Sequence, residues 1–211
     1  MKKDLIENLV EKQKTEGIAE KAMGSPDLLE GLFNSICSKN AKVRFVSAKA
    51  LRMISEKNPQ LLYSKMDFFA GLLDSKNNIL KWIVIDIVAN LTANDIDNEF
   101  NRLFEKFYSH LYEGSLITAG HVVDGSGRIA LSKPELMDRI TEKLLKVEEV
   151  PLPTTECRNI LLGKTISALG VYFDKTEGKD KVISFVKQQL NNSRNATRAK
   201  AEKFLAKFGY N

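Results

Sequence analysis

The chain repeats a helix-like pattern at a nearly constant interval, and this periodicity constrains its fold more than any other feature of the sequence. The segment over 43–62, VRFVSAKALRMISEKNPQLL, aligns with the segments over 80–99 and 118–137. Shorter matches follow at 161–173 and 197–209. The interval of about 37–41 residues is typical of proteins built from stacked helix pairs.

The composition also favours helices, because Leu, Ile, Lys, Glu and Ala are abundant and only five prolines occur. Apolar residues recur at three- and four-residue steps, the period of an amphipathic helix. We expect a helix over 3–22 and then five helix pairs, at 26–38 and 41–57, 59–74 and 78–93, 96–113 and 115–131, 134–147 and 155–173, and 179–191 and 195–208. No pair can bury its apolar face alone, so the pairs are expected to stack into a curved solenoid with one continuous core.

The segment VRFVSAKALRMI resembles the HEAT-repeat family in its Val-Arg pair, its Ala-Leu pair and its closing aliphatic residue. Armadillo-like stacking is a close neighbour that these residues do not separate from it. The resemblance implies an all-α, right-handed α-α superhelix that forms one domain over 1–211. Within it, 1–24 would hold an N-terminal capping helix and 179–211 a basic C-terminal capping repeat.

The sequence offers no sign of membrane, metal or redox chemistry. Cys37 and Cys157 lie far apart and outside any CxxC spacing, which favours free thiols in a reducing compartment. The first residues lack the unbroken apolar run of a secretory signal, and no apolar stretch is long enough to span a bilayer. We therefore expect a cytoplasmic protein with no metal site and no cofactor. No set of residues forms a complete active site, so we expect no catalytic residues.

Equivalent positions of the second helices define a stripe of residues spaced four apart, and hence on one helical face. The stripe carries Lys or Asp where core positions carry Leu, Ile or Val, so we expect it to be exposed. If second helices line the inner curve, as in HEAT proteins generally, this stripe is the concave floor that binds an extended partner. It contains Phe45 and Lys49, Trp82 and Asp86, Gly120 and Asp124, Gly163 and Ser167, and Ala199 and Lys203.

Trp82 and Asp86, one helical turn apart, resemble the aromatic–aspartate pair of HEAT-like DNA alkylation-repair glycosylases. The resemblance implies that Trp82 stacks on a damaged base or sugar and that Asp86 stabilises positive charge developing at the glycosidic carbon. A cation on the next second helix, His121 or Arg128, would then hold a phosphate. The alternative is that Trp82 is a packing residue and Asp86 a solvated or Arg-paired charge.

The segment SLITAGHVVDGSGRIAL (115–131) holds three glycines inside an expected helix, each of which costs about 1 kcal/mol relative to alanine. Either the glycines allow neighbouring helices to approach closely, or they leave room for a ligand on the concave floor. His121, Asp124 and Arg128 share one helical face beside these glycines.

The formal net charge of +5 is concentrated at the C-terminal end. Residues 179–211 hold eight Lys/Arg and two acidic residues, a surplus of six that leaves minus one for the rest of the chain. Arg194, Arg198, Lys203 and Lys207 lie near one side of the expected last helix. They form either the polar outer face of a capping repeat or a contact for phosphate or an acidic peptide.

Together these observations predict a non-enzymatic scaffold that binds a protein or peptide on its concave face, through aromatic anchors and charges that set register. The alternative is a nucleic-acid-binding protein, including one that resembles the glycosylases. The residues expected to bind a partner are Phe45, Lys49, Trp82, Asp86, His121, Asp124 and Arg128.

Overall fold

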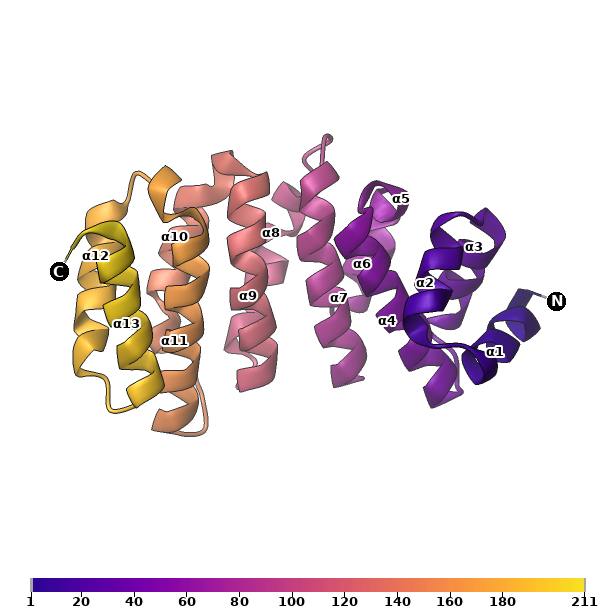
Figure 1. Cartoon of the computed structure of the whole chain (residues 1–211), viewed down its shortest axis with the longest axis horizontal. Coiled ribbons are helices and arrows are strands. Elements are labelled where there is room, and N and C mark those ends of the chain that lie inside the picture. The colour runs from indigo at the N-terminus through magenta and orange to yellow at the C-terminus, as the bar shows by residue number, and fades with distance from the viewer. Residues whose placement is uncertain (1, 211) are drawn as a thin grey trace. The chain divides into compact units, whose positions relative to one another are not determined.

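The computed structural model describes residues 2–210, and within them the chain forms α-helices and short 3-10 turns but no strand (Figure 1). The prediction of an all-α fold is confirmed. The chain divides into two compact units, one reaching to Asp97 and the other beginning at Asn98. Each unit is described by itself. The prediction of a single domain over 1–211 stays a prediction.

The unit up to Asp97 contains two of the five expected helix pairs behind an N-terminal helical segment. Its helices are α1 (Lys2–Lys12), α2 (Thr15–Met23), α3 (Pro26–Ser35), α4 (Ala41–Lys57), α5 (Gln60–Tyr63), α6 (Met66–Leu72) and α7 (Asn78–Leu91). A 3-10 turn over Thr92–Asn94 follows α7.

The prediction of a single helix over 3–22 is wrong. Helices α1 and α2 are separate and are joined at Lys14, whose backbone is extended. Ile6 and Val10 of α1 and Ile18 and Ala22 of α2 are all buried. The break therefore lets two short helices each turn an apolar face toward α3 and α4, which one straight helix would not allow.

The repeat extends into the turns before α4 and α7. Asn40 and Asn77 cap these two helices by accepting hydrogen bonds from backbone N–H groups of the first turn. Ser38 and Ser75, two residues earlier, in turn accept hydrogen bonds from the N–H groups of the two capping asparagines. Helices α4 and α7 consequently begin in the same way, and they also pack side by side.

The unit from Asn98 contains the other three pairs. Its helices are α8 (Glu99–Ser109), α9 (Leu116–Ser132), α10 (Met137–Leu145), α11 (Thr155–Tyr172), α12 (Lys179–Gln188) and α13 (Asn195–Phe208). The second helices α9, α11 and α13 run side by side with α11 in the middle (Figure 1). The aromatic side chains of α8 lie in the core, where the hydroxyl of Tyr108 donates a hydrogen bond to Ser126 of α9 at 3.0 Å.

The glycines of α9 and α11 mark close approaches between second helices. A Cβ atom at Gly127 would lie 3.2 Å from the carbonyl oxygen of Ala168, and one at Gly163 would lie 2.9 Å from Oγ1 of Thr197. At Gly120 the side chain of Lys164 fills the space, 3.2 Å from a Cβ position. At Gly127 and Gly163 the structure thus favours close packing over a ligand gap.

Candidate functional site

The four predicted site residues of the unit up to Asp97 have different surroundings. Phe45 of α4 is 46% exposed. Lys49, one turn later, lies with its Nζ 3.8 Å from a carboxylate oxygen of Glu16 in α2. Trp82 of α7 is partly buried. Asp86, which was expected to be exposed, is 7% exposed and therefore belongs to the interior.

The burial of Asp86 follows from its place between α4 and α7. The guanidinium of Arg52 on α4 approaches its carboxylate at 3.4 Å and also pairs with Glu56 at 3.3 Å. One turn along the same interface, the side-chain amide of Asn90 donates to Ser55 at 2.9 Å. A buried carboxylate needs a cation or hydrogen-bond donors beside it, and Arg52 supplies the cation here. Asp86 is thus part of a polar contact between two helices.

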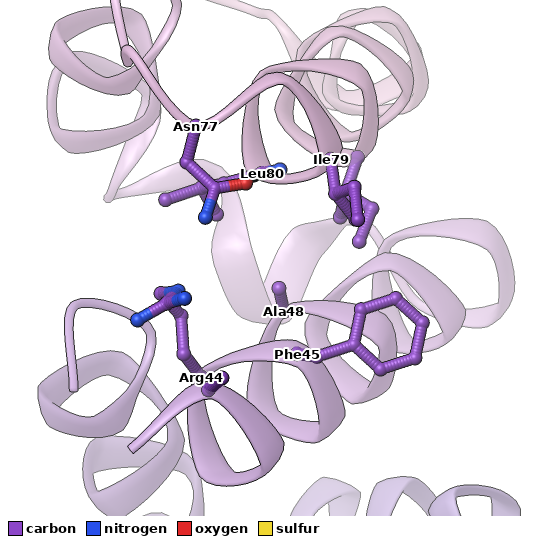
Figure 2. Close-up of a pocket in the computed structure, with 8 residues that line it drawn as sticks. Arg44, Phe45, Ala48, Asn77, Ile79 and Leu80 are labelled. Carbon is purple, nitrogen blue, oxygen red and sulfur yellow. Dashed lines mark hydrogen bonds between the residues drawn. The ribbon is translucent and has the colours of Figure 1, made fainter. Parts of the chain in front are cut away.

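A pocket of about 190 Å³ lies between the first turns of α4 and α7. Its walls are mostly apolar and include Ala48, Leu80 and Ile83. Phe45 and Ile79 stand at one end, one on each helix (Figure 2). Both side chains are about half exposed, at 46% and 51%.

The other end of this pocket is polar, because Arg44 and Asn77 face each other there (Figure 2). The guanidinium of Arg44 donates to the carbonyl oxygen of Ser38 at 2.7 Å, which ties the turn before α4 to the helix. The side-chain oxygen of Asn77 accepts the N–H of Leu80 at 3.1 Å. The arginine keeps further N–H donors, and the asparagine keeps its NH₂ group, for a partner's carbonyl or carboxylate oxygen.

Of the predicted residues, only Phe45 lines this pocket, and the sequence analysis missed Arg44, Asn77 and Ile79. The repeat carried a signal for two of these three residues. Arg44 belongs to the Val-Arg pair of the repeat, and Asn77 lies at the same position as the capping Asn40. Ile79 carries no repeat signal, since the shift that relates the two helices places it on Lys42.

In the unit from Asn98, the three predicted residues of α9 differ in their exposure. Asp124 is exposed, and its carboxylate pairs with Nζ of Lys164 on α11 at 2.5 Å. His121 is partly buried and Arg128 exposed. The described residues, 2–210, contain no group of three His, Cys, Asp or Glu side chains that could share a metal ion.

The four basic residues predicted as a contact for phosphate or an acidic peptide fall into two groups. Arg194 donates from Nε to Glu156 at 2.8 Å, and Arg198 donates to the carbonyl oxygen of Asn192 at 2.6 Å, much as Arg44 does in the other unit. These two arginines stabilise the turn before α13. Lys203 and Lys207 instead line a groove between α11 and α13.

Within each unit, consecutive helix pairs whose second helices pack side by side give an armadillo/HEAT-like repeat fold, and comparison with solved structures agrees. A designed armadillo repeat protein matches over 100% of both chains, with 12% identity and a TM-score of 0.61. An engineered protein from the Northeast Structural Genomics Consortium matches 99% of this chain and 96% of its own, with 14% identity and a TM-score of 0.55. At these identities the likeness shows the fold alone, and it confirms the predicted all-α solenoid.

A scan against protein-family models gives no match, and a search of curated proteins gives none. Within residues 2–210, no helix has the length and apolar character needed to cross a bilayer.

Proposed function

We propose that this protein is a non-enzymatic scaffold that binds an extended segment of a protein partner, with the pocket between α4 and α7 receiving one apolar side chain of that segment. The observation that carries the proposal is the apolar pocket with two half-exposed, large apolar side chains, Phe45 and Ile79, at its mouth. Exposed apolar side chains around a concave site are typical of interaction surfaces.

The size and chemistry of the pocket support a peptide as its occupant. Its volume of about 190 Å³ lies below the roughly 300–1,000 Å³ of pockets that hold small-molecule ligands, and so suits a single side chain. Phe45 would serve as the aromatic anchor, since aromatic residues contribute strongly to binding at interfaces. Arg44 and Asn77 at the polar end would bind the main chain of the peptide.

The glycosylase alternative fits this site less well. The resemblance requires Asp86 to face a substrate, but its carboxylate is buried and paired with Arg52. Trp82 is partly buried and is not among the residues that line the pocket. A carboxylate held in this way belongs to the contact between α4 and α7 rather than to an open substrate site.

A selection from short random peptides displayed on phage tests the proposal. We expect the peptides enriched on the wild-type protein to share one large apolar residue. Their affinity for Phe45→Ser should fall by about tenfold or more, because an aromatic anchor is lost. The measurement is fluorescence anisotropy of the enriched peptide after synthesis and labelling.

Ile96→Ser is the matched control, because Ile96 belongs to the same unit and is 82% exposed outside the pocket. It should bind the peptide as the wild type does. Equal losses in the two variants would reject the pocket as the binding site. A labelled oligothymidine that binds more tightly than any selected peptide, with affinity falling steeply as salt rises, would favour the nucleic-acid alternative.

A further inference from the structure

A second concave site lies between α11 and α13, in the unit from Asn98. This groove has a volume of about 490 Å³, within the range of ligand-binding clefts. Its apolar surface comes from both helices, and Val171 is 51% exposed there. Phe204 closes the base, because its ring packs 3.4 Å from the Cβ position of Gly170.

The rim of this groove is basic. The residues that line it include three lysines of α13, Lys200, Lys203 and Lys207, and no carboxylate. Lys203 and Lys207 are both exposed, and the ammonium group of Lys207 lies over the ring of Phe208, 4.5 Å from its centroid. The three lysines are spaced at three and four residues, so they project from one face of α13 along the groove.

Lys200, the third lysine of this rim, is held against α11. Its ammonium group donates to the carbonyl oxygen of Gly163 at 2.9 Å. The pKa of Lys200 lies below its usual value, first because the amine is partly buried and then because the charge of Lys164 repels it, although Asp124 acts in the opposite direction. A carboxylate placed near Lys200 would offset both effects, because an opposite charge favours the ammonium form.

We propose that the groove between α11 and α13 binds an acidic amphipathic segment of a protein partner, with the apolar side chains of the segment against Val171 and Phe204 and its carboxylates against Lys200, Lys203 and Lys207. The inference concerns a site separate from the pocket between α4 and α7, and each can fail without the other. The apolar groove supplies the contact area, and the three lysines select for negative charge.

The surroundings favour an acidic peptide over nucleic acid or a membrane. Binding of single-stranded nucleic acid combines a basic groove with exposed aromatic rings on which bases stack. Here Phe204 is 5% exposed, and Phe208, which also lines the groove, is partly buried with the ammonium group of Lys207 over its ring. The nearby Arg194 and Arg198 are engaged with Glu156 and with the turn before α13, so lysines from one face of α13 supply the positive charge along the groove.

The probe is a labelled helical peptide of about four turns with Leu and Phe along one face and Glu along the other. Three further peptides replace Glu by Gln, replace Leu and Phe by Ser, or scramble the order. The variant is Lys203→Glu combined with Lys207→Glu. The control is Lys181→Glu combined with Lys187→Glu, which changes two exposed lysines of α12 and the net charge by the same amount.

We expect the wild type to bind the acidic amphipathic peptide, and the Lys203→Glu, Lys207→Glu variant to lose about tenfold or more in affinity, as for paired charges at an interface. The control and Phe45→Ser should bind as the wild type does, which separates this site from the pocket between α4 and α7. The Gln, Ser and scrambled peptides should all bind more weakly. Circular dichroism melts of both double variants establish that they are folded.

Equal losses in the α12 control would overturn the proposal, because net charge alone would then explain binding. Unchanged affinity in the Lys203→Glu, Lys207→Glu variant would overturn it as well. Tighter binding of oligothymidine, or of phosphatidylserine-rich vesicles, that is lost in the same variant would assign the groove to nucleic acid or to a membrane surface instead.

Discussion

Phe104→Ala is expected to lower the free energy of unfolding of the unit from Asn98 by about 3–5 kcal/mol, the usual cost of removing a buried aromatic ring. Phe104 is fully buried in α8, and its ring centroid lies 4.6 Å from that of Tyr108. The guanidinium of Arg139 lies 4.0 Å from the same centroid. The substitution removes the ring that contacts Tyr108 and Arg139, and it leaves a cavity in the core. Urea denaturation followed by circular dichroism measures the change.

Tyr112→Ala is the control for this experiment. Tyr112 is an aromatic residue of the same unit that is 41% exposed, and its removal should cost much less than that of Phe104. If Phe104→Ala were as stable as Tyr112→Ala, the aromatic side chains of α8 would not form the core described here.

Gly163→Val is expected to destabilise the same unit by about 1–3 kcal/mol, because it overpacks the contact between α11 and α13. A Cβ atom at this position would lie 2.9 Å from Oγ1 of Thr197, and a β-branched side chain could not rotate away. Thr197 has little freedom to move, since it is fully buried and its hydroxyl donates to the carbonyl oxygen of Asn159 at 2.7 Å. Thermal melts give the melting temperatures of the variant and the wild type, and we expect the lower value for the variant.

Gly71→Ala is the contrasting variant, at a glycine whose Cβ position is open. Gly71 lies in α6, and nothing comes within 4 Å of its Cβ position. Alanine should therefore stabilise this helix by about 0.5–1 kcal/mol through its higher helix propensity.

A Gly163→Val protein that melts at or above the wild-type temperature would show that α11 and α13 do not approach as closely as described.

Much of the fold could be predicted from the sequence, because local signals repeat in each helix pair. The helices expected over 41–57 and 155–173 correspond to α4 and α11 within a residue at each end. The break between α1 and α2 could not be predicted, since the segment over 3–22 carries no proline or interior signal strong enough to end a helix. It depends on where two apolar faces find partners in the folded unit.

The candidate site was predicted less well for a geometric reason. Equivalent residues such as Phe45 and Trp82 occupy the same position on successive helices, but a groove forms between helices, where different positions face each other. Phe45 consequently has Ile79 opposite it in the pocket. The burial of Asp86 likewise depends on Arg52, which lies on another helix and carries no sign of the contact in the sequence.

The C-terminal charge shows the same limit. The sequence places Arg198 and Lys203 on one basic helix. Only the structure shows that Arg198 donates a hydrogen bond to the turn before α13, whereas Lys203 lines the groove between α11 and α13. The repeat did offer a clue, because Arg198 aligns with Arg44, and both donate to a carbonyl oxygen of the preceding turn.

The most direct test of the account is methyl NMR of the isoleucine side chains during titration with the peptide selected on the wild-type protein. Ile79 and Ile83 line the pocket between α4 and α7, whereas Ile96 lies outside it in the same unit. We expect the methyl signals of Ile79 and Ile83 to shift as the peptide binds and those of Ile96 to stay unchanged. Saturable binding that leaves Ile79 and Ile83 unchanged would contradict it.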